Sequence, residues 1–235
     1  MARTVDPQLH AARRDAILDV VERLVVEKGF DRLTIQDLIA GTGMSKGAFY
    51  HYFAAKSDVL EALLERRLAR WEAALAPVAR GPGGPRDRLR ALLRELGGAK
   101  SRDRALLVEA LRSLYSDDNA LVHARTRRAA AARFAPLVEA LVVEGVAAGE
   151  LAVHDPVGAA RVVLSLMQEG ADQIGLALLG IADGATTAAE LDRTALAYQR
   201  AIHTTLGAAP GSLDFIDPAD LSAWAAAATG HGGRP

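Results

Sequence analysis

The sequence has no cysteine, few aromatic residues and no surplus of charge of either sign. The absence of cysteine excludes disulfide bonds, thiolate nucleophiles and zinc sites built on cysteine. A net charge of −1 over 235 residues excludes a protein that coats nucleic acid through bulk positive charge. Any contact with DNA therefore has to come from a local group of positive side chains.

Long hydrophobic runs are also missing. The longest uncharged apolar stretch of the C-terminal half, Gln173–Ala182, is far shorter than the roughly 20 residues that span a bilayer. The first residues, Met1–Pro7, have no apolar core like that of a signal peptide. Hydrophobic residues make up 50% of the chain and charged residues 24%, as in ordinary globular proteins. We therefore expect a soluble, cytoplasmic protein that does not bind membranes.

The apolar residues follow helical spacing, and strand signals are nearly absent. Asp6 and Pro7 are typical of a helix start, and Gly29 is typical of a helix end. The sequence therefore predicts an all-α protein. After the first helix, the expected helices are Thr34–Gly41, Ser45–Phe53, Lys56–Ala76, Arg86–Leu96, Asp103–Tyr115, Asn119–Ala148 with a kink at Pro136, Pro156–Leu179, Ala188–Leu206 and a last helix carrying Leu221, Trp224, Ala225 and Ala228.

The segment Leu33–Lys56 contains two short capped helices joined by a tight turn at Thr42-Gly43-Met44, which is the pattern of a helix-turn-helix. We expect one set of its side chains to pack inward against the first helix. That set is Ile35, Leu38, Ile39, Met44 and Phe49. The remaining residues of the second short helix, Lys46, Gly47, Tyr50 and His51, then form its outer surface.

This outer surface suits DNA chemically. Lys46 offers donors to guanine or phosphate, and Gly47 lets the helix backbone approach a groove closely. Tyr50 and His51 add hydrogen bonds and flat apolar surface. Phosphate contacts are expected from Thr34 and Ser45 at the two helix starts and from Lys56 at the start of the fourth helix. The alternative is that these residues are ordinary solvated surface.

The same segment resembles the TetR family of regulators. The shared residues are Gly29-Phe30, Thr34, Ile39-Ala40, Gly43-Met44-Ser45-Lys46-Gly47, Phe49-Tyr50, Tyr52-Phe53 and Lys56. The resemblance implies a three-helix DNA-binding domain, a helical ligand-binding and dimerisation domain, and a repressor controlled by a small effector. Two departures are Thr42, where the family often has Ala, and Ala55, where a capping Ser or Asn is common. Ala55 predicts a poorly capped fourth helix.

On this basis the chain divides into an N-terminal helix-turn-helix DNA-binding domain and a larger helical domain that binds an effector and dimerises. The expected bounds are residues 7–67 for the DNA-binding domain and 68–214 for the effector-binding domain. An additional C-terminal helix over 215–229 and a disordered tail over 230–235 follow.

A ligand pocket is expected between the long helices, because Ala-rich helices leave volume where scarce larger side chains lie near one another. A small apolar or amphipathic effector suits such a pocket. Its predicted lining is Trp71, Arg112, Tyr115, His123, Phe134, Met167, Gln168 and Asp172. The alternative is close packing of these helices with Gln168 and Asp172 facing water. The polar stripe Arg161, Ser165, Gln168 and Asp172 is more typical of a solvated face or of salt bridges within the chain than of a cavity lining.

One short reading helix contacts few bases, so we expect a homodimer on a palindromic operator in double-stranded DNA. The helices Pro156–Leu179 and Ala188–Leu206 are predicted to form a four-helix interface with their copies. The predicted interface residues are Ala171, Ile174, Gly175, Leu178, Leu191, Ala195, Tyr198 and Ile202.

Other functions have less support in the sequence. The six histidines show no metal-ligand spacing, and no motif indicates catalytic residues or a cofactor. The arginines of 86–94 and 125–133 are more typical of a solvated helix face than of a second nucleic-acid patch. Two alternatives stay open: an all-helical enzyme and a ligand-independent architectural DNA-binding protein. The second is compatible with an aromatic content of only 5%.

Overall fold

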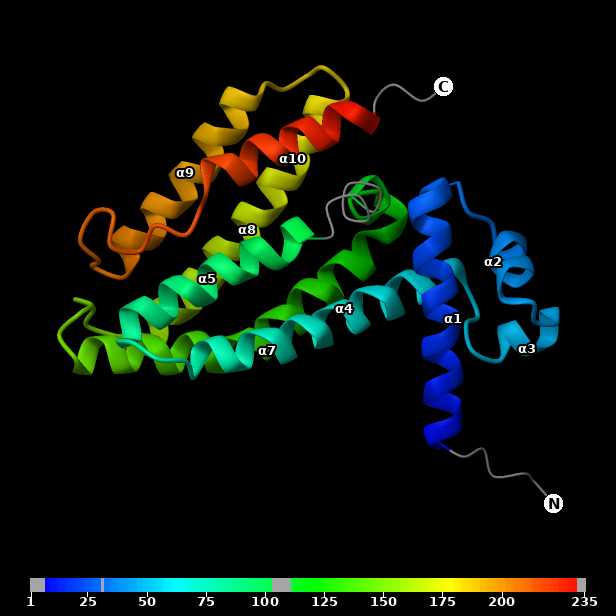
Figure 1. Ribbon diagram of the computed structural model, residues 1–235, viewed down its shortest axis with the longest axis horizontal. Coiled ribbons are helices and arrows are strands. Elements are labelled where there is room, and N and C mark those ends of the chain that lie inside the picture. Colours follow the sequence, from blue (N-terminus) through cyan, green and yellow to red (C-terminus); the bar gives the residue numbers. More distant parts are fainter. Residues whose placement is uncertain (1–6, 31, 103–110, 232–235) are drawn as a thin grey trace.

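The computed structural model describes residues 7–30, 32–102 and 111–231. Over these residues the chain is helical without strands, so the all-α prediction is confirmed (Figure 1). The helices are α1 (Pro7–Lys28), α2 (Ile35–Thr42), α3 (Lys46–Tyr50), α4 (Lys56–Ala79), α5 (Pro85–Arg102), the short 3-10 helix η1 (Asp117–Asn119), α7 (Ala120–Ala147), α8 (Pro156–Ala182), α9 (Ala188–Thr205) and α10 (Pro218–His231).

Most helix bounds differ from the expected ones by only a few residues. The largest difference is in α5, which continues to Arg102 rather than ending at Leu96, and the ends of α3, α4 and α8 each differ by three residues. The helix expected over Asp103–Tyr115 lies mainly outside the described residues, although 111–114 are helical. Residues 230 and 231 belong to α10 and not to a tail, and 232–235 lie outside the described residues.

The first four helices form a small unit at one end of the molecule (Figure 1). Its core contains Leu18, Leu38, Phe49 and Phe53, none of which is more than 1% exposed. Arg66 of α4 holds α1 against α4, because its guanidinium contacts Asp19 at 2.7 Å and Glu22 at 2.9 Å. The unit that carries α3 is therefore rigidly packed around α1.

Helix α4 leaves this unit and joins it to the larger helical unit, where it lies alongside α7 (Figure 1). The interior there is a cluster of leucine, valine and alanine side chains from α4, α5, α7, α8 and α9. Helix α8 packs against α7, α9 and α10. By length and composition α8 alone among the described helices is apolar enough to cross a membrane. It carries Arg161, Glu169 and Asp172 in ion pairs to α7.

The C-terminal helix α10 lies across α8 and α9. The segment that leads into it is held by the buried side chain of Gln199 on α9. The Gln199 Oε1 accepts hydrogen bonds from the backbone N–H of Phe215 (3.0 Å) and of Ile216 (2.9 Å). Its Nε2 donates to Asp214 (3.1 Å). Leu221, Ala225 and Ala228 of α10 then pack against Leu178 of α8 and the buried side of α9. Helix α10 is thus an integral layer of the larger unit.

Candidate functional site

The turn that orients α3 is fixed by its caps. The Thr34 hydroxyl accepts a hydrogen bond from the Asp37 N–H (3.1 Å), and the Asp37 carboxylate accepts one from the Thr34 N–H (2.9 Å). This capping box satisfies backbone donors that α2 leaves unpaired at its start. At the other end, Gly43 has a φ of 65°, a left-handed conformation in which glycine carries no steric penalty. The Ser45 hydroxyl then accepts from the Ala48 N–H (3.3 Å) and starts α3.

Helix α3 has one buried and one exposed side. Phe49 is fully buried in the core of the unit, and Lys46, Gly47, Tyr50 and His51 are exposed. A side-chain atom at Gly47 would meet no heavy atom within 4 Å, so the space in front of this helix is open. The predicted division between core and outer surface is confirmed. The role of the outer residues toward DNA stays a prediction.

The three residues expected to contact phosphates have different surroundings. The polar groups of Thr34 are taken by its cap, because its hydroxyl also donates to Asp37 (2.7 Å). Hydrogen bonds from Thr34 and the ammonium of Lys28 (3.0 Å) hold the pKa of Asp37 well below its ordinary value. Ser45 is exposed at the start of α3. The Lys56 ammonium lies 4.8 Å from the centre of the Phe30 ring.

The start of α4 corrects the expectation of a poor cap. Ala55 has no side-chain oxygen, but the carboxylate of Asp58 accepts hydrogen bonds from the N–H groups of Ala54 and Ala55, both at 3.0 Å. Asp58 therefore satisfies these donors from within the first turn and places a negative charge at the positive end of the helix. A search for capping residues before the helix does not find Asp58, because it lies within the first turn of α4.

The second feature is a cavity of about 320 Å³ in the larger unit. Its walls come from α4, α5, α7, α8, α9 and α10, and they are mainly apolar. All the predicted lining residues except Arg112 border it, namely Trp71, Tyr115, His123, Phe134, Met167, Gln168 and Asp172. Arg112 was wrongly included, because its guanidinium pairs with Asp183 on the surface, where its side chain is 52% exposed. That the other residues bind an effector stays a prediction.

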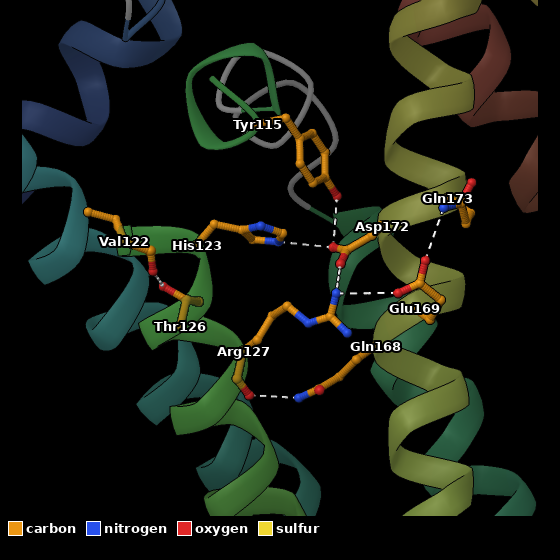
Figure 2. A network of polar contacts seen from close by, with 9 residues as sticks. All are labelled: Tyr115, Val122, His123, Thr126, Arg127, Gln168, Glu169, Asp172 and Gln173. Carbon is orange, nitrogen blue, oxygen red and sulfur yellow. Dashed lines mark hydrogen bonds and ion pairs between the residues drawn. The ribbon is translucent and has the colours of Figure 1, made fainter. Parts of the chain in front are cut away.

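A polar network lies at one side of the cavity (Figure 2). The Asp172 Oδ1 accepts from the Tyr115 hydroxyl (3.1 Å) and lies 3.1 Å from His123 Nε2. The Asp172 Oδ2 accepts from the Arg127 guanidinium, which also lies 3.5 Å from Glu169. Gln168 donates from Nε2 to the backbone oxygen of Arg127 (2.6 Å).

The polar stripe of α8 is therefore divided. Arg161 and Ser165 are exposed, as a solvated face predicts, whereas Gln168 and Asp172 face α7 and the cavity. Arg161 and Asp172 form ion pairs within the chain, with Glu139 and Arg127, which is the other arrangement expected of this stripe. The sequence reasoning also missed Arg127, which it placed on a solvated face. Two further arginines of 125–133 are paired, because Arg125 contacts Glu61 at 3.2 Å and Arg133 contacts Glu65 and Glu72, whereas Arg128 is exposed.

Five of the predicted dimer residues are buried within the single chain, so the prediction is wrong for their side chains, whereas Ala171, Ile174 and Tyr198 are half-buried and stay a prediction. Leu191, Ala195 and Ile202 have no exposed surface, and Leu178 is 4% exposed. Gly175 is covered by the ring of Tyr115, whose hydroxyl would lie 2.6 Å from an added Cβ. Ala171, Ile174, Gly175, Leu178, Tyr198 and Ile202 border the cavity. The apolar face of α8 and α9, for which helical periodicity indicates no partner, is covered within the chain by α10 and Tyr115.

The segment Phe215–Trp224 was expected to be an addition to the domain, yet Phe215, Leu221 and Trp224 form part of the cavity wall. Both tryptophans of the chain, Trp71 and Trp224, border the cavity. The signal that could have found this wall is the apolar stripe of the last helix, which needs a partner surface to cover it.

Comparison with known proteins relates the N-terminal part of this chain to a family of bacterial regulators. Residues 17–63 match the model of the family described as bacterial regulatory proteins, tetR family. The HTH-type transcriptional repressor NemR of Escherichia coli is 34% identical over 77 residues, which cover 32% of this chain and 39% of NemR. The repressor KstR2 of Mycobacterium tuberculosis is 28% identical over 81 residues, 34% of this chain and 40% of KstR2. The matches thus span about two fifths of these relatives.

Solved structures extend the likeness beyond the N-terminal part. A regulator of the TetR/AcrR family from Thermobifida fusca has 29% identity and a TM-score of 0.52, covering 67% of this chain and 82% of its own. The complex of RolR with the ligand resorcinol has 16% identity and a TM-score of 0.61, covering 98% of this chain and 97% of its own. At that identity the second likeness concerns the fold alone.

Proposed function

The chain belongs to the TetR family of bacterial regulatory proteins, and we propose that it is a cytoplasmic, sequence-specific DNA-binding transcriptional regulator, a repressor that a small molecule releases from its operator. The observation that supports this most directly is the exposed side of α3, where Lys46, Gly47, Tyr50 and His51 stand in front of a fully buried Phe49. A short helix held this way enters the major groove, where Lys46 and Tyr50 reach base edges and backbone.

The test of DNA recognition is selection of duplexes from a random-sequence library with the full chain. We expect a palindrome whose half-sites lie roughly 34–36 Å apart or at a multiple of that spacing. Lys46→Ala and Tyr50→Ala should each weaken binding to the selected duplex with unchanged thermal unfolding, because both side chains are exposed. Selection without an enriched sequence, or equal affinity of both variants, argues against this surface.

The cavity supports control by a ligand over the ligand-independent architectural alternative. Two acidic residues of its wall are paired with arginines within the chain: Asp172 with Arg127, and Asp217 with Arg94 at 3.8 Å. A charged ligand would find no spare counter-ion in these two pairs, and its desolvation would be costly. We therefore propose an uncharged, mainly apolar or amphipathic effector. Compounds that quench the fluorescence of Trp71 and Trp224 should weaken operator binding at the same concentrations.

We also propose a homodimer, through the outer side of α8 and α9 and not through the side predicted from periodicity. Val162 and Leu176 of α8 are 48% and 47% exposed although both are large and apolar. They lie on one helix side, 14 residues apart, together with the exposed Ser165 and Gln173. Sedimentation should show a dimer that Leu176→Arg dissociates. Val143→Arg is the matched control, because Val143 is also exposed (44%) but lies on α7.

A further inference from the structure

The first turns of α7 face both functional parts of the molecule. Val122 is 5% exposed and belongs to the core cluster of the N-terminal unit, together with Phe49 and Leu60. The next residue, His123, borders the cavity and contacts Asp172. Two residues further, Arg125 pairs with Glu61 of α4 at 3.2 Å. Any displacement of this segment relative to α8 therefore acts directly on the unit that carries α3.

Asp172 is the acceptor that ties this segment to α8 (Figure 2). Its three donors, Tyr115, His123 and Arg127, all come from residues 115–127. The Asp172 side chain is only 15% exposed, so these hydrogen bonds are little weakened by water. Burial and the negative charge of Asp172 raise the pKa of Tyr115, which keeps its hydroxyl a donor. The Tyr115 ring lies directly on the backbone of α8 at Gly175.

We propose that Asp172 is the contact through which occupancy of the cavity reaches the DNA-binding unit, and that the effector carries an uncharged hydrogen-bond donor, a hydroxyl or an amide N–H, that binds this carboxylate. This inference rests on the proposed function. An ionised carboxylate only accepts hydrogen bonds, so it selects a donor and disfavours an anion. A ligand donor at Oδ1 competes with Tyr115 and His123, and Arg127 keeps Oδ2. Residues 115–123 then lose their hold on α8, and the segment that packs through Val122 is released.

The test of the coupling uses Asp172→Asn, with Tyr115→Phe as a milder variant that keeps the ring. Hydrogen exchange of residues 117–126 should become at least about fivefold faster in both, and operator affinity without ligand should fall at least about fivefold, the lower end of usual coupling. The matched control is Glu139→Gln, which removes a different α7–α8 contact, that of Glu139 with Arg161 at 3.5 Å. The control should keep wild-type exchange and affinity.

The outcomes separate this inference from the proposed function. Wild-type exchange and wild-type operator affinity in Tyr115→Phe and in folded Asp172→Asn overturn the coupling, as does an equal effect of Glu139→Gln. If the wild type selects no operator, the proposed function fails, and the exchange measurement still decides whether Asp172 holds residues 117–126.

The donor requirement is tested with 2-naphthol and naphthalene, which differ by one hydroxyl on the same flat body. The aromatic side chains around the cavity, among them Trp71, Phe134 and Trp224, suit such a body. Calorimetric titration should show that the wild type binds 2-naphthol at least about fivefold more tightly than naphthalene, an advantage that Asp172→Asn reduces because a neutral amide oxygen is the weaker acceptor. Equal affinity of the two probes, or binding of neither, contradicts the donor requirement.

Discussion

Replacing Gly47 by alanine should change the stability of the fold and its affinity for DNA in opposite directions. Gly47 lies in the first turn of this helix and is exposed. Its backbone does not adopt the left-handed conformation that only glycine tolerates, and an added Cβ meets no heavy atom within 4 Å. The folded structure therefore accepts the methyl group without strain.

The expected change in stability follows from the unfolded chain. Gly→Ala at a compatible helical position stabilises a protein by roughly 0.4–1 kcal/mol, because alanine has less backbone freedom to lose on folding. For a chain of this size that corresponds to a rise in Tm of roughly 1–4 °C. Toward DNA the effect is opposite, because the methyl group projects into the open space in front of α3. We expect operator affinity at least about tenfold weaker, or about 1.4 kcal/mol.

The assay combines thermal unfolding of Gly47→Ala with fluorescence anisotropy of the selected operator duplex, and an unrelated duplex serves as control for non-specific binding. A higher Tm with wild-type operator affinity would refute close approach of α3 to DNA at this residue. A lower Tm would refute the open space in front of Gly47.

Three further outcomes are expected. The pKa of Asp37 in the folded protein lies below its ordinary value of 3.8, so the stabilising effect of Asp37 is complete above that pH and is lost as the pH falls below it. Unfolding scans between pH 5 and 3 should therefore show a smaller loss of stability in Asp37→Asn than in the wild type. Gln199→Leu leaves the N–H groups of the half-buried residues Phe215 and Ile216 without their acceptor. Denaturant unfolding should show a loss of about 1–3 kcal/mol, and an unchanged midpoint would count against the bond. Asp58→Ala removes the cap of α4 and should lower stability by about 1 kcal/mol, a loss that Asp58→Asn should partly restore.

Local features of the fold could be predicted from the sequence with few errors. The caps at Thr34 and Ser45 and the turn at Gly43 depend on residues within four positions of one another, so sequence spacing is sufficient to find them. The same holds for the buried Phe49 and the exposed Tyr50, because helical periodicity alone separates the two sides of α3.

Errors arose where the partner of a side chain is distant in sequence. The apolar side of α8 was interpreted as a dimer surface, yet Gly175 packs against Tyr115 and Leu178 packs with α10. Periodicity shows that a helix side is buried but not which segment buries it. Arg127 was missed for the same reason, because its acceptor Asp172 lies 45 residues further along the chain.

We propose that this protein binds its operator through α3 and releases the DNA when a ligand fills the cavity. This proposal is tested most directly by the affinity of the dimer for its selected operator, measured at increasing concentrations of a compound that quenches Trp71 and Trp224. We expect the operator Kd to rise at least about tenfold, with a midpoint that coincides with that of the quenching. Unchanged operator Kd at a concentration that saturates the quenching would contradict the account.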